Sequence, residues 1–129
     1  MLIDIKVTVK GEPDTVSFTR IYQFNDEIDY NILSNSIKTI KEKLVRKMRI
    51  NINEALYIYL EYIIDALHLH KRRREIIANA SKILRPDQVM IGVPESLREI
   101  IFNIKIDSNQ RRRIVIAEPI SSTTYILAS

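Results

Sequence analysis

Two histidines close together in the sequence are the first residues whose type suggests chemistry. His68 and His70 are separated by a single residue. On a helix, where each residue turns the chain by about 100°, they would point about 200° apart, whereas helical metal-ligand pairs are spaced by three or four residues. On an extended segment they would share a face and could hold a metal. Because the chain has no cysteine and no Asp, Glu or His triad at ligand spacing, we expect no complete metal site.

Three carboxylates are the next candidates, since Glu54, Glu61 and Asp65 are spaced so that they can share one side of a helix. Paired acids can carry acid-base catalysis, and Glu61 and Asp65 form an i, i+4 pair. On an otherwise apolar helix, such acids more often meet Lys or Arg from a neighbouring element. The sequence contains no glycine-rich phosphate loop and no serine in a nucleophile elbow. We therefore predict no catalytic, cofactor-binding or metal-binding residue in this chain.

Positive charge is concentrated in two runs, although the net charge is only +4 at pH 7. The runs are Lys71 to Arg74 and Arg111 to Arg113. Such runs can neutralise phosphates and give affinity for nucleic acid. Basic runs are a weak signal, however, and more commonly form a solvated surface or contact an acidic partner subunit. We favour this second interpretation and keep nucleic-acid binding as the alternative.

The composition indicates one globular domain. A chain of 129 residues with 46% hydrophobic residues is long enough to bury a core. No apolar run approaches the roughly 18 residues of a membrane span, and Asp4 interrupts the first apolar stretch, so we expect neither a membrane helix nor a signal peptide. The lack of cysteine agrees with a reducing compartment. We expect a cytoplasmic protein that makes no contact with a membrane.

Two alternating stretches predict a β-hairpin at the N-terminus. Apolar and polar residues alternate over Leu2 to Lys10 and again over Val16 to Ile21, with a turn sequence at Gly11 to Asp14 between them. A single hairpin is only marginally stable. We therefore expect this hairpin to dock on its own domain or on a partner chain.

Helical periodicity follows the hairpin. Asn25 and Asp26 are candidate caps. Acidic residues gather near them and basic residues at the far end, as the helix dipole favours. The residues that recur at helical spacing predict one buried stripe on a surface helix. They are Leu33, Ile37, Ile40, Leu44 and Met48.

A second helix opens at Asn51, which with Glu54 resembles a capping box. This helix is apolar on most sides, so we expect it to be central. The apolar stripe of this helix stops after Leu67, and apolar residues resume at Ile76, half a turn out of phase. We therefore predict a break near His70 and a third helix over about 73–84, although the lack of glycine at the break leaves open that the two helices run together.

Tyrosines are spread around the second helix at Tyr57, Tyr59 and Tyr62. A row of aromatic side chains can form a platform on which nucleic-acid bases stack. Aromatic residues dominate protein cores and subunit interfaces more often. We favour a place in the core or in an interface.

A second hairpin is predicted near the C-terminus. Residues alternate over Ile100 to Ile106, a turn sequence occupies Asp107 to Gln110, and Arg113 to Ala117 forms the returning strand, which Pro119 ends. The predicted fold class is therefore α+β, with a three-helix core, a C-terminal β-hairpin and an additional N-terminal β-hairpin.

A turn sequence links the third helix to this hairpin. Pro86 suits the first position of a short helical turn, and Gly92 is expected to stop that turn. Val93 precedes Pro94, which favours an extended backbone leading into the strand. The motif reads I-L-R-P-D-Q-V-M-I-G-V-P-E from Ile83 to Glu95.

This motif resembles the gamma subunit of urease, which shows V-L-T-R-D-Q-V-M-x-G-V-P-E at the same place and ends its closing strand in a Pro-Ile pair, as at Glu118-Pro119-Ile120 here. The similarity extends without a gap back to N-I-N-E-A at Asn51, where the family usually reads N-Y-P-E-A. The chain departs from the family at Asp65 to His70, where the family usually reads E-G-A-R-D-G. The N-terminal hairpin has no counterpart in the family pattern.

The resemblance implies a single gamma-like domain over 1–129, with a hairpin extension at 1–23, a core at 24–120 and a tail at 121–129. It implies a non-catalytic structural subunit of a urease or urease-like nickel hydrolase, which converts urea to ammonia and carbamate. Nickel and the catalytic residues would belong to the alpha subunit. Partners would be the alpha and beta subunits, assembled as a trimer of heterotrimers. The alternative is a gamma-like domain repurposed as a stand-alone binding protein, with nucleic acid as the candidate ligand of its arginine clusters.

Overall fold

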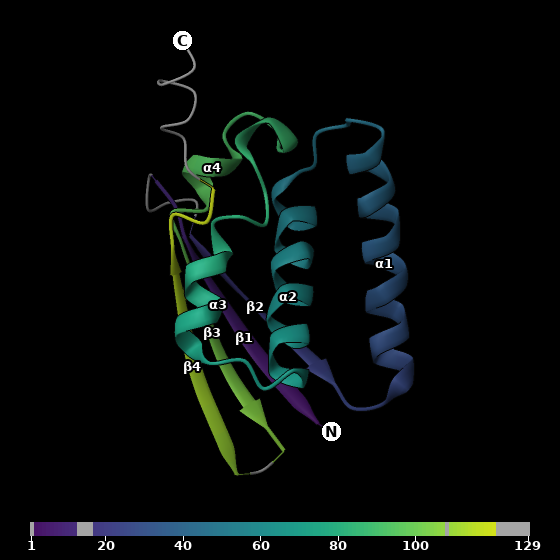
Figure 1. Ribbon diagram of the computed structural model, residues 1–129, viewed down its shortest axis with the longest axis vertical. Coiled ribbons are helices and arrows are strands. Elements are labelled where there is room, and N and C mark those ends of the chain that lie inside the picture. The colour runs from purple at the N-terminus through teal and green to yellow at the C-terminus, as the bar shows by residue number, and fades with distance from the viewer. Residues whose placement is uncertain (1, 13–16, 108, 121–129) are drawn as a thin grey trace.

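The computed structural model has two layers, a four-stranded sheet and a layer of helices that covers one of its faces (Figure 1). Residues 2–12, 17–107 and 109–120 are described. Within these ranges no helix is long and apolar enough to cross a membrane. The fold class is α+β, as the sequence predicts.

The two predicted hairpins join into a single antiparallel sheet with the strand order β2-β1-β3-β4. The first strand of the N-terminal hairpin pairs with the first strand of the C-terminal hairpin, so that Ile3 lies opposite Ile106 and Val9 lies opposite Ile100. The hairpin therefore docks on its own domain. The strands are β1 (Ile3–Lys10), β2 (Phe18–Phe24), β3 (Glu99–Ile106) and β4 (Gln110–Ala117).

Alternation along the strands sorts apolar and polar side chains between the two faces of the sheet. The inward residues of the central strand β1 are at most 2% exposed. Inward residues of β3 and β4 are equally buried, apart from the partly buried Ile106 opposite Ile3, and they pack in the same cluster as the helices. These inward residues are Ile3, Ile5, Val7 and Val9 on β1, Ile100, Phe102 and Ile104 on β3, and Ile114 and Ile116 on β4.

The first helix, α1 (Glu27–Val45), begins at Asp26, whose side chain accepts a hydrogen bond from the Asp29 backbone N–H at 3.1 Å. Three residues of the predicted stripe are buried, and Leu44 is partly buried. The prediction that Met48 belongs to the buried stripe is wrong. The chain turns left-handed at Lys47 (φ 60°), which ends the helix and leaves Met48 half exposed.

The second helix, α2 (Ile52–His68), is the central helix, as predicted. Its capping box is complete, because the Asn51 side chain accepts from the Glu54 N–H at 2.9 Å and the Glu54 side chain accepts from the Asn51 N–H at 3.1 Å. Nine of its residues are buried. They pack against both α1 and the sheet.

The break near His70 is sharp despite the missing glycine. His70 itself adopts the left-handed conformation (φ 52°). Its N–H donates to the Leu67 carbonyl at 3.1 Å and the Lys71 N–H donates to the Ala66 carbonyl at 3.0 Å, which is the Schellman pattern of helix ends. The second and third helices are therefore separate.

The third helix, α3 (Arg73–Ala80), is four residues shorter than the predicted span of 73–84. After Ala80 the chain makes turns, since Lys82 and Ile83 donate to carbonyls only three residues back. Leu84 is nevertheless buried. Leu84 has the spacing of a helical core residue but reaches the core from a non-helical segment. Periodicity alone cannot distinguish these two cases.

The turn motif folds as two short helices, η2 (Pro86–Gln88) and α4 (Val93–Ser96). Pro86 occupies the first turn of η2, as expected. Gly92 does not stop η2, which ends at Gln88, but instead precedes α4 in a left-handed conformation (φ 93°). The expectation that Val93 is extended is wrong, because Pro94 falls in the first turn of α4, where proline is tolerated and where Val93 can bury its side chain.

The central position of β1 predicts that the N-terminal hairpin is essential for stability. Ile5→Ala should lower the free energy of unfolding by about 3 kcal/mol, because it removes buried methyl groups and leaves a cavity. Ile21→Ala, in the same hairpin but at a side chain that is 68% exposed, should change it by less than about 0.5 kcal/mol. Urea denaturation measures both. Equal effects would show that the hairpin does not pack as described.

Candidate functional site

Two of the three acidic residues of α2, Glu54 and Glu61, each pair with a lysine of α1. The Glu54 carboxylate accepts a hydrogen bond from Lys43 Nζ at 2.6 Å. Burial favours the neutral acid, but the hydrogen bonds from Lys43 and the Asn51 N–H, together with the lysine charge, outweigh it, so the pKa of Glu54 lies below its usual value. Glu54 is therefore a structural carboxylate that joins α1 to α2.

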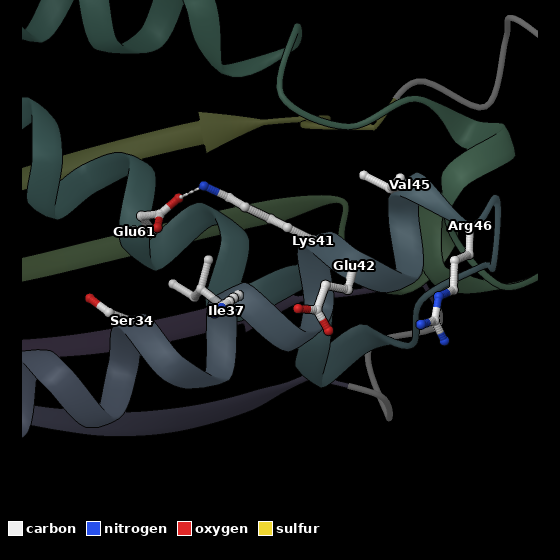
Figure 2. Close-up of a pocket in the computed structure, with 8 residues that line it drawn as sticks. Ser34, Ile37, Lys41, Glu42, Val45, Arg46 and Glu61 are labelled. Atoms are coloured by element: carbon white, nitrogen blue, oxygen red, sulfur yellow. Dashed lines mark ion pairs between the residues drawn. The ribbon is translucent and has the colours of Figure 1, made fainter.

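Glu61 forms the second link between these helices. Lys41 extends from α1 and places its Nζ 2.8 Å from a Glu61 carboxylate oxygen, as Figure 2 shows. The pair lies along an open groove of about 430 Å³ whose lining includes Ile37, Glu42 and Val45. The groove combines aliphatic surface with charges that already have partners or face the solvent. It offers a contact surface and no group poised for proton transfer.

Asp65 lies one helical turn after Glu61 and borders a second groove of about 420 Å³. Partial burial and the negative charge of Glu61 raise the pKa of Asp65, and Lys41, His68 and Lys71 oppose that rise. A raised pKa is common for a general acid. Glu61 forms an ion pair with Lys41, so the structure favours the ion-pair interpretation for Glu61, whereas Asp65 is influenced by Lys41 and Lys71 through their charge.

The two histidines do not form a ligand pair. His68 ends α2 and lies against the Tyr30 ring, with the ring centroids 5.9 Å apart. His70 is part of the left-handed turn that follows. Within residues 2–12, 17–107 and 109–120, no three His, Cys, Asp or Glu side chains converge at a distance suited to a metal ion.

The tyrosines of α2 lie in the core or at its margin, and not on a stacking platform. Tyr59 is fully buried and donates to the Pro119 carbonyl at 3.3 Å, and this burial raises the pKa of its hydroxyl. Tyr62 donates to the Ile76 carbonyl at 2.5 Å, which ties α2 to α3. Tyr57 contacts the Tyr22 ring edge-on, with the centroids 6.1 Å apart. Each ring therefore fixes α2 to another part of the chain.

One residue of the first basic run, Arg73, meets the second basic run in space, which the sequence positions do not reveal. Arg73, at the start of α3, and Arg111 to Arg113, on β4, line the same groove on the sheet. The helix α3 packs against β4, and this contact brings Arg73 to the second run. Lys71 belongs elsewhere, since it borders the groove beside Asp65.

Exposed apolar residues on the outer side of α1 are a feature that the sequence interpretation did not single out by residue. Ile28 and Ile32 are one helical turn apart, both are more than half exposed, and Val45 near the end of the helix is 82% exposed. Met90 and Ile91 are also exposed in the turn before α4. The signal was present, because these residues lie outside the buried stripe of α1. Exposed apolar side chains that share one side of a helix, as Ile28 and Ile32 do, are typical of sites of protein contact.

These features define a class of protein. It is an α+β domain in which Glu54 and Glu61 pair with lysines of a neighbouring helix, and whose surface carries exposed apolar side chains. The family model for the gamma subunit of urease matches residues 24–120. The chain belongs to the urease gamma subunit family.

A curated relative supports this membership. The protein named urease subunit gamma/beta of Streptomyces avermitilis is 28% identical over 89 residues, which cover 69% of this chain and 39% of the relative. The chain thus spans about two fifths of the length of that relative. The family match begins at residue 24, so it leaves out β1 and all but the last residue of β2.

The lowered pKa of Glu54 predicts an acid-sensitive link between α1 and α2. Because the native pKa lies below the unfolded value of about 4.3, the charge of Glu54 stabilises the fold above that pH, and the contribution disappears as the pH falls through the native pKa. Glu54→Gln, which keeps an acceptor for the Asn51 N–H, should cost about 1 kcal/mol of unfolding free energy at pH 7 and less near pH 3.

The matched control is Glu42→Gln, a change at an exposed glutamate of α1. Urea denaturation of both variants at several pH values measures the effect. A cost for Glu54→Gln that is the same at pH 7 and pH 3 would contradict this account.

Proposed function

We propose that this chain is a non-catalytic structural subunit of a urease or urease-like nickel hydrolase. The reaction, urea to ammonia and carbamate, would take place in a separate large subunit that holds the nickel ions. The observation that carries the proposal is the family match over residues 24–120, which includes all the helices and the C-terminal hairpin. The structural use of Glu54 and Glu61 agrees with it.

The proposed partners are the alpha and beta subunits of the same enzyme, in a trimer of alpha-beta-gamma units. The name of the Streptomyces avermitilis relative joins gamma and beta in one protein, which supports a close association of these two subunits. The proposed compartment is the cytoplasm. The absence of cysteine agrees with it.

The outer side of α1 supports a role in assembly. Ile28 and Ile32 lie on one face of the helix, and both are exposed to water. Burial in an interface would remove this apolar area from water, which is favourable. A small groove of about 180 Å³ continues this surface, bordered by Ile32, Leu33 and the rings of Tyr22 and Tyr57. A partner side chain inserted there would meet an apolar floor.

The direct test is recovery of the tagged chain from its native cells, followed by identification of the proteins that accompany it and an assay for urea hydrolysis. We expect a large nickel-containing subunit and urease activity in the recovered complex, and none with the purified chain alone. Recovery of the chain without such a subunit would refute the proposal. Urea hydrolysis by the isolated chain would refute the non-catalytic role.

The outer face of α1 gives a sharper prediction. The double variant Ile28→Asn with Ile32→Asn should fold normally, because both side chains are exposed, but should bind its partner subunits about tenfold more weakly. Ile21→Asn, at an isoleucine that is equally exposed but on the sheet, is the control. Co-purification from cells that express all subunits, compared with the circular dichroism of each variant, measures the effect. Equal loss in the control would count against α1 as the contact surface.

A further inference from the structure

A groove of about 620 Å³ on the sheet gathers positive side chains from three strands and a helix. Strand alternation places four of them on the face opposite the helices, since their sequence neighbours Ile5, Ile104 and Ile114 are buried on the helix side. The cationic residues that line the groove are Lys6 on β1, Lys105 on β3, Arg111, Arg112 and Arg113 on β4, and Arg73 on α3.

These charges are not neutralised within the described residues. Asp4 is the acidic residue of the lining, against six cationic residues. Among the ion pairs and side-chain hydrogen bonds of the described part of the chain, none involves these six side chains, although other lysines and arginines of the chain are paired. A concave surface lined by one sign of charge concentrates the field and attracts ions of the opposite sign.

The groove is built jointly by the family core and by the hairpin that precedes it. Arg73, Lys105 and the arginines of β4 lie within the family match, whereas Lys6 precedes residue 24. The pairing of Lys6 with Asn103 across β1 and β3 brings the two parts together. The groove thus depends on a segment that the family match does not include, and it is a property of this chain in addition to its family role.

The chemistry of the lining selects among anionic partners. Interfaces between proteins centre on buried aromatic and apolar anchors. The lining of this groove has no aromatic residue, and Ile21, at the margin of the groove, contributes an exposed apolar side chain. Protein–DNA interfaces are more polar and far more positive. Arginine, which supplies four of the six cations, binds phosphate through two parallel N–H bonds. The absence of aromatic rings removes base stacking, so contacts would go to phosphates.

We propose that this groove binds the phosphate backbone of nucleic acid without sequence preference. Strand spacing sets the contacts, because Arg111 and Arg113 are two residues apart on one face of β4, about 6.6 Å along the strand. Lys6 and Lys105 lie on the neighbouring strands and widen the positive surface across the sheet. Contacts to several phosphates make the affinity strongly dependent on salt.

The test is fluorescence anisotropy of a labelled DNA duplex of about 20 base pairs, mixed in sequence, titrated with the full chain at several salt concentrations. We expect binding that weakens linearly on a plot of log affinity against log salt. The variant Arg111→Gln with Arg113→Gln should bind at least about tenfold more weakly at low salt, and its slope should be shallower by about 2, one unit for each lost phosphate contact.

Two further variants separate the groove from general charge and from misfolding. Arg46→Gln with Arg49→Gln removes two exposed arginines that do not line the groove, and it should retain nearly full affinity. Asp4→Asn removes the acid of the groove and should tighten binding about threefold, a gain that a folding defect cannot produce.

Three outcomes would overturn the proposal. The first is no binding of the duplex at low salt. The second is equal loss of affinity in the Arg46 and Arg49 variant and in the Arg111 and Arg113 variant. The third is tighter binding of polyglutamate than of DNA at equal charge, which would assign the groove to an acidic protein segment.

Discussion

The antiparallel pairing of β1 with β3 is the interaction on which the rest of the structure depends. It converts two hairpins, each marginal alone, into a four-stranded sheet whose inner face is continuous. In this register, Ile3, Ile5, Val7 and Val9 face the helices and the polar residues between them face outward. A shift by one residue would exchange the two faces and bury Lys6. The register therefore determines both the core beneath the helices and the charge distribution on the open face.

The sequence revealed the local elements better than their connections. The capping box at Asn51 and the cap at Asp26 are readable because they involve residues three positions apart. Alternation likewise identified both hairpins. The pairing of β1 with β3 joins residues that are far apart in the sequence, such as Ile3 and Ile106, and no local pattern encodes it. For the same reason the basic groove could not be foreseen, since strand order brings Lys6 to Lys105 and helix packing brings Arg73 to β4.

The errors in the candidate elements also have physical causes. Periodicity placed Met48 in the stripe of α1, but a left-handed turn at Lys47 ended the helix first. It extended α3 to Leu84, a residue that the core accepts from a turn just as well. The expected absence of catalytic residues remains a prediction. The geometry does explain the acids of α2, because Glu54 and Glu61 each bind a lysine of α1 and so hold the two helices together.

Among the residues that the structure describes, four non-glycine residues turn the chain in the left-handed region: Lys47, His70, Asp107 and Glu118. Each carries a steric cost of about 1–2 kcal/mol in that conformation. Glycine would remove this cost but would give the unfolded chain more conformations to lose on folding, by an amount of similar size. In this chain, which has two glycines in 129 residues, the strain at the corners is offset by the smaller conformational freedom of the unfolded state. At these corners the Cβ atom restricts the backbone angles more than glycine would, so each bend is stiffer than a glycine bend at the same place.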